Sequence, residues 1–338
     1  MDPVARARLL DATQAFDSPI TRWGTTTVVG VLFVAPLLVL LLAKIGKLDA
    51  ANRKELLLRC GSWAVIAPAL LGPLLLGAAW WIGATYLLAL LLFREFGRIT
   101  GLFREPVVCG VVYLGLTATY FGALDNWYVM FIGATPLTIA GIAAAAVFRD
   151  KPGGYVQRVA LGTLGFVLFG TGLGHLAYFG NDVEFRPLLF ILIAAVEDND
   201  VFAYLCGKTL GKRKLCPNTS PNKTVGGAVG AVVCTTLLVM GTSHFLIAGG
   251  LGRWWLHFLA AGALVSVAGQ MGDLVLSSIK RDIGIKDTGT ILPGHGGLLD
   301  RFDSLLLATP VVFYFVAYFR GIGVGQPTNV LTQFSGGI

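Results

Sequence analysis

The sequence predicts an all-α, polytopic integral membrane protein with about ten transmembrane helices. The 338 residues are 55% hydrophobic and only 13% charged, whereas about a quarter of the residues in a typical soluble domain are charged. Mean hydropathy is +0.73. Apolar runs of about 20 residues recur along the chain, and this is the length that crosses a hydrocarbon core about 30 Å thick. Together these observations exclude a soluble globular protein.

The apolar runs place the helices in order, each separated from the next by a polar or glycine-rich connection. The only ambiguous boundary lies near Trp80 and Trp81, where 62–94 could also form one kinked helix. We divide the chain into lipid-facing structural helices (1–185), a catalytic membrane region with two charged connections (186–320) and a flexible tail (321–338). The predicted helices are 25–44, 62–78, 80–94, 106–122, 127–147, 158–178, 187–207, 226–247, 254–277 and 304–320.

Basic residues predict the orientation of these helices. Most of the 26 Lys and Arg residues fall in alternate connections, which therefore lie on one side of the membrane. The positive-inside rule puts that side in the cytoplasm and both termini outside. Topology and anionic headgroups then account for the net charge of +7, so no nucleic-acid partner is expected. The basic connections are 44–61, 94–105, 149–158, 207–224 and 280–301.

The connection within 278–303 is the most informative part of the chain, because it contains as many acidic residues as basic ones. Anchoring to headgroups explains Lys and Arg but not the aspartates. Asp273 lies inside the preceding apolar span, and helical spacing puts it on one face with Ser277, Lys280 and Arg281. Helix capping could explain one of Asp300 and Asp303, but it does not explain a buried Asp273.

A second polar site is Glu197-Asp198-Asn199-Asp200, which follows the apolar run 187–196. Ten helical residues span about 15 Å, so these acids are expected deep in the bilayer. Ionisable groups at such depth normally face an aqueous cavity and mark function, although a structural polar network between helices is the alternative.

Next along the chain are several lysines, the segment Ser220-Pro221-Asn222-Lys223-Thr224 and the Gly-rich run 226–230. Glycines at the start of a helix allow backbone N–H groups to approach phosphate oxygens. His295 between glycines could donate to a phosphate or act as a general acid, or be an ordinary loop residue. Carboxylates favour Mg²⁺, and basic side chains favour phosphate oxygens. This combination suits phosphoryl or nucleotidyl transfer, and no Walker A loop or dinucleotide fingerprint is present.

The pattern K-R-x₄-K-D-x-G-x₃-P-G-H-G-G-x₂-D-R-x-D, here Lys280 to Asp303 with a serine at 277 or 278 before it, resembles the signature of the phosphatidate cytidylyltransferases (CDP-diacylglycerol synthases). The stretch Asn199–Thr224 also resembles the family's upstream region. The resemblance implies transfer of CMP from CTP to phosphatidic acid, giving CDP-diacylglycerol and pyrophosphate in phospholipid biosynthesis. It also implies Mg²⁺, alone or together with a second cation, as well as a homodimer and a bacterial inner-membrane location with the active site facing the cytoplasm.

The resemblance implies roles for individual residues as well. Asp273, Asp300 and Asp303, with Asp200, would hold metal, and Lys280, Arg281 and His295 would join the first three in catalysis. The residues implied to bind nucleotide or lipid phosphate are Ser220, Lys223, Lys286, Asp287, Gly294, Gly296, Gly297 and Arg301.

One position departs from the family pattern. After Ser-Pro-Asn-Lys-Thr the family has a hydrophobic residue and then Glu-Gly, whereas this chain has Val225-Gly226-Gly227. A related enzyme that uses CTP with another lipid, such as a polyprenol or ether-lipid phosphate, therefore remains an alternative. An ion-coupled transporter that uses the buried acids is a third reading.

Overall fold

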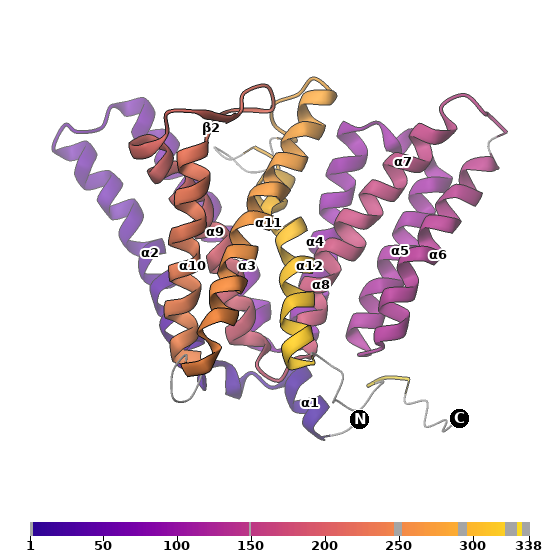
Figure 1. The fold of residues 1–338 in the computed structure, drawn as a ribbon, viewed down its shortest axis with the longest axis horizontal. Coiled ribbons are helices and arrows are strands. Elements are labelled where there is room, and N and C mark those ends of the chain that lie inside the picture. Colours follow the sequence, from indigo (N-terminus) through magenta and orange to yellow (C-terminus); the bar gives the residue numbers. More distant parts are fainter. Residues whose placement is uncertain (1–2, 149, 247–251, 290–295, 322–329, 333–338) are drawn as a thin grey trace.

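The computed structural model describes residues 3–148, 150–246, 252–289, 296–321 and 330–332. Long helices run back and forth between two ends of the molecule, and α1 and the C-terminal end of α12 lie at the same end (Figure 1). The elements are α1 Pro3–Leu10, η1 Thr13–Phe16, α2 Pro19–Lys44, α3 Ala50–Leu76, α4 Ala78–Ile99, η2 Leu102–Arg104, α5 Pro106–Leu124, α6 Tyr128–Val147, α7 Tyr155–Phe166, η3 Val167–Gly172, α8 Leu173–Tyr178, η4 Phe179–Asn181, α9 Phe185–Leu210, β1 Lys214–Cys216, β2 Ser220–Thr224, α10 Val225–Leu246, η5 Gly252–Trp254, α11 Trp255–Asp282 and α12 Leu299–Arg320.

The prediction of a polytopic helical membrane protein is confirmed. Over the described residues, nine helical stretches are long and apolar enough to cross a membrane. The helix α9 has 26 residues and is long enough to cross a membrane, but it carries too many charged side chains to count among these nine. The ten predicted helices therefore correspond to the nine stretches and α9. The ambiguous region 62–94 forms two helices, α3 and α4, which separate at Gly77, where φ is +137°.

The apolar core lies where α4, α5, α8, α9 and α12 meet. Large side chains such as Trp81, Phe93, Phe169 and Phe313 are fully buried there. In contrast, α2 buries little of its apolar surface within the chain, which suits a helix that faces lipid. The helices α9 and α12, from the region implied in function, thus share one buried core with the N-terminal helices α4, α5 and α8.

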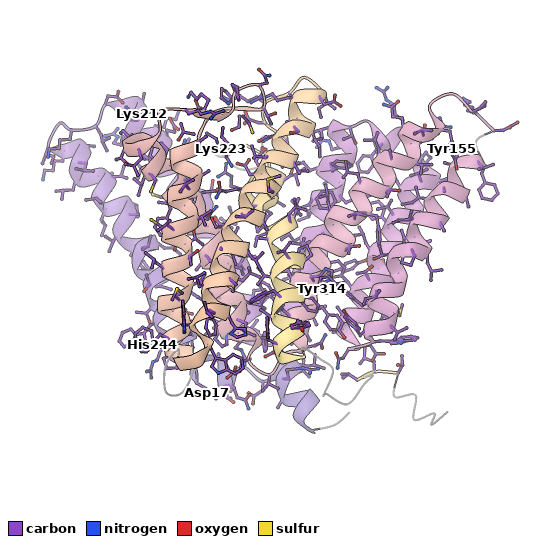
Figure 2. The ribbon with its side chains drawn as sticks, in the orientation of Figure 1. Asp17, Tyr155, Lys212, Lys223, His244 and Tyr314 are labelled. Carbon is purple, nitrogen blue, oxygen red and sulfur yellow. The ribbon has the colours of Figure 1, made fainter. Side chains whose placement is uncertain are left out.

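The strands β1 and β2 form an antiparallel hairpin that the all-α prediction did not include. Lys214 pairs with Thr224 and Cys216 pairs with Ser220. The hairpin lies at the end of the molecule opposite α1 (Figure 1). Figure 2 places Lys212 and Lys223 at this end, and Asp17 and His244 at the other. The basic hairpin therefore marks one face of the membrane domain.

Candidate active site

Four elements bring the predicted charged residues together near the hairpin: α9, β2, the end of α11 and the start of α12. The α11 helix continues to Asp282 and α12 begins at Leu299. Lys280 and Arg281 are thus helical rather than part of a loop, and Asp300 and Asp303 lie in the first two turns of α12. Helical geometry, rather than a flexible connection, positions most of the site.

The Asp300 carboxylate organises the chain on both sides of 290–295. Its Oδ1 accepts a hydrogen bond from Lys280 Nζ at 2.7 Å. Its Oδ2 accepts from the Thr288 and Gly297 amides at 2.9 and 3.0 Å, and lies 3.0 Å from Thr288 Oγ1. A carboxylate offers about four lone-pair positions, two on each oxygen, so Oδ2 is fully used while Oδ1 keeps one position free. The ion pair with Lys280 is buried, and the side chains are 11% and 6% exposed for Lys280 and Asp300, respectively.

Glu95 enters the same network from α4 and was not predicted from the sequence. It is buried, and its Oε1 accepts from Thr288 Oγ1 at 2.9 Å. Its Oε2 accepts from the Leu299 amide, the first N–H of α12, at 2.8 Å. Glu95 falls just after the end of the predicted helix 80–94, where an acid beside Arg94 gives no distinct signal in the sequence.

A second group of acids forms where α9, α11 and α12 approach one another. Asp303 interacts electrostatically with Asp273 and Asp200, and Asp273 forms an ion pair with Lys223 from β2. Asp273 also accepts a hydrogen bond from Ser277 at 3.1 Å, as the helical spacing predicted. A Cβ on Gly272 would lie only 2.5 Å from the Asp303 carbonyl oxygen, so α11 and α12 are in close contact here. Asp303 does not cap α12, because it lies one turn inside the helix and accepts from the Ser304 amide.

The neighbouring Asn199 has a structural role. It is buried, and its Oδ1 accepts hydrogen bonds from Thr235 at 3.1 Å and Ser266 at 2.5 Å. These bonds join α9 to α10 and α11, and so fix the orientation of α9. Glu197 and Asp200, on either side of Asn199, interact electrostatically with Arg301. Asn199 therefore belongs to a polar network that joins three helices, which was the structural alternative for this segment. Glu197 and Asp200 instead interact with Arg301 of the charged group.

The remaining predicted residues differ in how closely they approach this network. Gly296 lies between Asp287 and Asp300: a Cβ there would be 3.0 Å from Asp300 Oδ2 and 3.5 Å from the Asp287 Cβ. Arg281 donates to the Thr219 carbonyl at 3.4 Å and the Ile285 carbonyl at 3.1 Å, which ties the hairpin to α11. Lys286 is exposed, and Ser220 begins β2. Gly294 and His295 lie outside the described residues.

The carboxylates differ in how well they fit a metal ion. Among the residues that the structure describes, no three His, Cys, Asp or Glu side chains are grouped as a metal site. Asp300 Oδ2 is occupied by the Thr288 and Gly297 donors, so a metal would reach this carboxylate at the remaining position of Oδ1, beside the Lys280 ammonium group. Asp200, Asp273 and Asp303 form a mutually repelling group of hard oxygen ligands, the type that Mg²⁺ prefers. The type of donor atom at these three suits a divalent cation, although among the described residues they do not make up a group of three metal ligands.

Gly226, the position that departs from the family pattern, is in close contact with the end of α9. A Cβ at 226 would lie 2.6 Å from the Leu210 carbonyl oxygen and 2.9 Å from its carbon. Because these are backbone atoms, no side chain fits at 226 unless α9 and α10 move apart. Glycine here allows the close crossing of the two helices beside the hairpin.

Comparison with known proteins gives consistent matches. The profile of a family described as "Cytidylyltransferase family" matches residues 57–319. The "Uncharacterized protein YnbB" of Escherichia coli (strain K12) is 38% identical over 217 residues, which cover 61% of this chain and 70% of that protein.

Two further relatives carry the name "Phosphatidate cytidylyltransferase". The protein from Bacillus subtilis (strain 168) is 46% identical over 131 residues, 39% of this chain and 48% of the relative. The protein from Staphylococcus haemolyticus (strain JCSC1435) is 39% identical over 141 residues, 42% of this chain and 53% of the relative. The chain thus spans about half the length of these two relatives.

Proposed function

The chain belongs to the cytidylyltransferase family, and from this premise we propose that it transfers CMP from CTP to phosphatidic acid. The products are CDP-diacylglycerol and pyrophosphate. The observation that carries the proposal is the meeting of Lys223, Lys280 and Arg301 with a group of aspartates between membrane helices. Family membership also favours the enzyme over the ion-coupled transporter.

In the proposed reaction an oxygen of the lipid phosphate attacks the α-phosphorus of CTP. The bond from that phosphorus to the oxygen bridging to the β-phosphorus breaks, and pyrophosphate leaves with that oxygen. No protein nucleophile is needed, so the protein contributes positioning and neutralisation of charge.

The basic side chains are placed for these tasks. Lys223 and Lys280 are held by ion pairs with Asp273 and Asp300, so their ammonium groups are ordered before substrate arrives. An ordered cation stabilises developing negative charge without first paying the entropy of immobilisation. Arg281, Lys286 and Arg301 would bind further phosphate oxygens of CTP and of the lipid, and Gly296 and Gly297 allow backbone approach near Asp300.

We propose that Mg²⁺ is held by Asp273 and Asp303 with Asp200, and that Asp300 joins through the free position of its Oδ1, beside Lys280. A bound divalent cation would neutralise phosphate charge and orient the triphosphate. Asp300 in the arrangement described instead orders the loops around Lys280.

A different lipid acceptor is the second candidate. The relative YnbB, which matches over 70% of its length, is named without an activity. The packing of Gly226 also excludes the glutamate that the family pattern has. The apolar part of an acceptor contacts lipid-facing helices without a sequence motif, so a polyprenol or ether-lipid phosphate would meet the same charged group.

We also propose where the protein is located and how it assembles. We place the protein in the bacterial inner membrane as a homodimer, with the hairpin face in the cytoplasm where CTP is available. Cysteine labelling at Lys212→Cys with an impermeant maleimide, in intact and lysed cells, tests the orientation. Labelling in intact cells as strong as in lysed cells would reverse it.

The function is tested with purified protein in detergent, CTP and a panel of lipid phosphates. Phosphatidic acid is expected to give CDP-diacylglycerol with Mg²⁺ and no product with EDTA. Product with a polyprenol or ether-lipid phosphate alone would establish the second candidate. If CTP stays intact with every lipid phosphate, both enzymatic proposals fail.

A further inference from the structure

Glu95 lies in α4, far along the chain from the charged network, yet it contacts both segments that flank 290–295. On one side it is bonded to Thr288 Oγ1, and on the other to the Leu299 amide. The helix α12 has no side-chain cap from its own N-terminal residues, since Leu298 occupies that position. Glu95 therefore supplies the cap of α12 from a different helix.

The Glu95 carboxylate is tightly enclosed by the two segments that it contacts. Its environment has little space: a Cβ on Gly297 would lie 2.0 Å from Thr288 Oγ1, and one on Gly289 would lie 2.6 Å from Glu95 Oε1. Glycines at these positions let the two loop segments close around the carboxylate. A carboxylate at a helix N-terminus is favoured by the unpaired N–H groups and by the helix dipole.

Thr288 links Glu95 to Asp300. Its hydroxyl lies 2.9 Å from Glu95 Oε1 and 3.0 Å from Asp300 Oδ2. A hydroxyl has one hydrogen to donate, so the two carboxylates share a single donor. Because Asp300 also binds Lys280, displacement of Thr288 or of the first turn of α12 would move that ion pair. Glu95 thus controls the position of the ammonium group that would meet phosphate.

We propose that Glu95 is a positioning residue for this site, one that holds the loops and the start of α12 so that Asp300 and Lys280 are aligned for CTP. The effect on turnover rests on the proposed function, whereas the effect on loop order does not. A shift of about 1 Å in a positioning group can reduce a rate by a factor of about 100.

The test compares Glu95→Gln and Glu95→Ala with the matched control Glu55→Gln. Glu55 is another helical glutamate, which is exposed and pairs with Arg59 four residues on. We expect Glu95→Ala to lower kcat roughly 100-fold with a much smaller change in the KM for CTP. Glu95→Gln keeps one acceptor oxygen, so it should retain an intermediate kcat. The control should keep the wild-type rate.

A double-mutant cycle with Thr288→Val tests the route of the effect. If Glu95 acts through Thr288, the double variant should be far less impaired than the product of the two single losses, because contacting residues are not additive. If the loss of kcat in the double variant equals the product of the two single losses, Glu95 does not act through Thr288. A kcat of Glu95→Ala equal to wild type, per folded molecule by size-exclusion chromatography, would overturn the proposal.

Hydrogen exchange separates this inference from the proposed function, because it needs no turnover. In Glu95→Ala, a peptide covering 296–303 should exchange faster, while peptides from α5 and α6 should be unchanged. Unchanged exchange at 296–303 would overturn the proposal even in an active enzyme. Faster exchange in a protein inactive with phosphatidic acid would support the loop role and reject only the reaction.

Discussion

Replacement of Asp300 by asparagine is expected to reduce transfer of CMP about 100-fold while the helices remain folded. Asparagine has the same shape as aspartate, but it carries no charge and has only one acceptor oxygen. Lys280 Nζ loses its counter-charge in either orientation of the amide, and the amide NH₂ group then faces either Lys280 or the three donors from Thr288 and Gly297.

The contacts of Asp300 set the size of the effect. Removal of one partner from a buried ion pair costs about 3–5 kcal/mol, and hydrogen bonds to a charged group contribute about 1.5–3 kcal/mol each. The amide oxygen can still accept one bond, so we expect the lower end, about 3 kcal/mol. That value is a cost in folding stability. The expected loss of about 100-fold in kcat/KM comes separately from displacement of Lys280, because a shift of about 1 Å in a positioning group can reduce a rate by about that factor.

The assay is formation of CDP-diacylglycerol by variants purified in detergent, with thermal unfolding measured in parallel. Asp282→Asn is the matched control, because Asp282 is an exposed acid at the end of α11 in the same signature. The control should keep wild-type activity. If Asp300→Asn is within about twofold of wild type, the assigned role of the Lys280–Asp300 pair is wrong.

Three further predictions concern the acids, the metal and the helix crossing. Asp273→Asn should lower turnover by about two orders of magnitude without a change in helix content by circular dichroism, because the partner of Lys223 loses its charge; wild-type turnover would remove Asp273 from the site. Removal of divalent cations with EDTA should abolish CDP-diacylglycerol formation and addition of Mg²⁺ should restore it, whereas full activity in EDTA would remove the metal from the proposal. Gly226→Ala should lower the unfolding temperature, since the added Cβ meets the Leu210 backbone at a cost of about 1–3 kcal/mol. The matched control, Gly241→Ala in the same helix, has open space at its Cβ and should be neutral or stabilising, so equal shifts in the two variants would contradict the close crossing.

Hydropathy made the helices predictable, because a span must be apolar over a fixed length whatever it packs against. The predicted run 106–122 corresponds to α5 at Pro106–Leu124, and 127–147 to α6 at Tyr128–Val147. The ends beside the charged connections were less accurate. The α11 helix, predicted to end at 277, continues to Asp282, and Lys280 in this added turn pairs with Asp300.

Contacts between distant parts of the chain could not be predicted in the same way. Glu95 has no local feature that separates it from a surface acid, and its partners Thr288 and Leu299 come from another part of the sequence. Gly226 was read as a missing acid, whereas the structure shows that the Leu210 backbone fills the space of its side chain. Both features depend on how helices cross, which a hydrophobic pattern does not specify.

The central claim, that the charged group transfers a cytidylyl unit to a lipid phosphate, is tested most directly by following labelled CTP. With phosphatidic acid and Mg²⁺, label at the α-phosphorus should move into the lipid, and label at the γ-phosphorus should appear only in pyrophosphate. Release of γ-label as inorganic phosphate, with no α-label in any lipid, would contradict it.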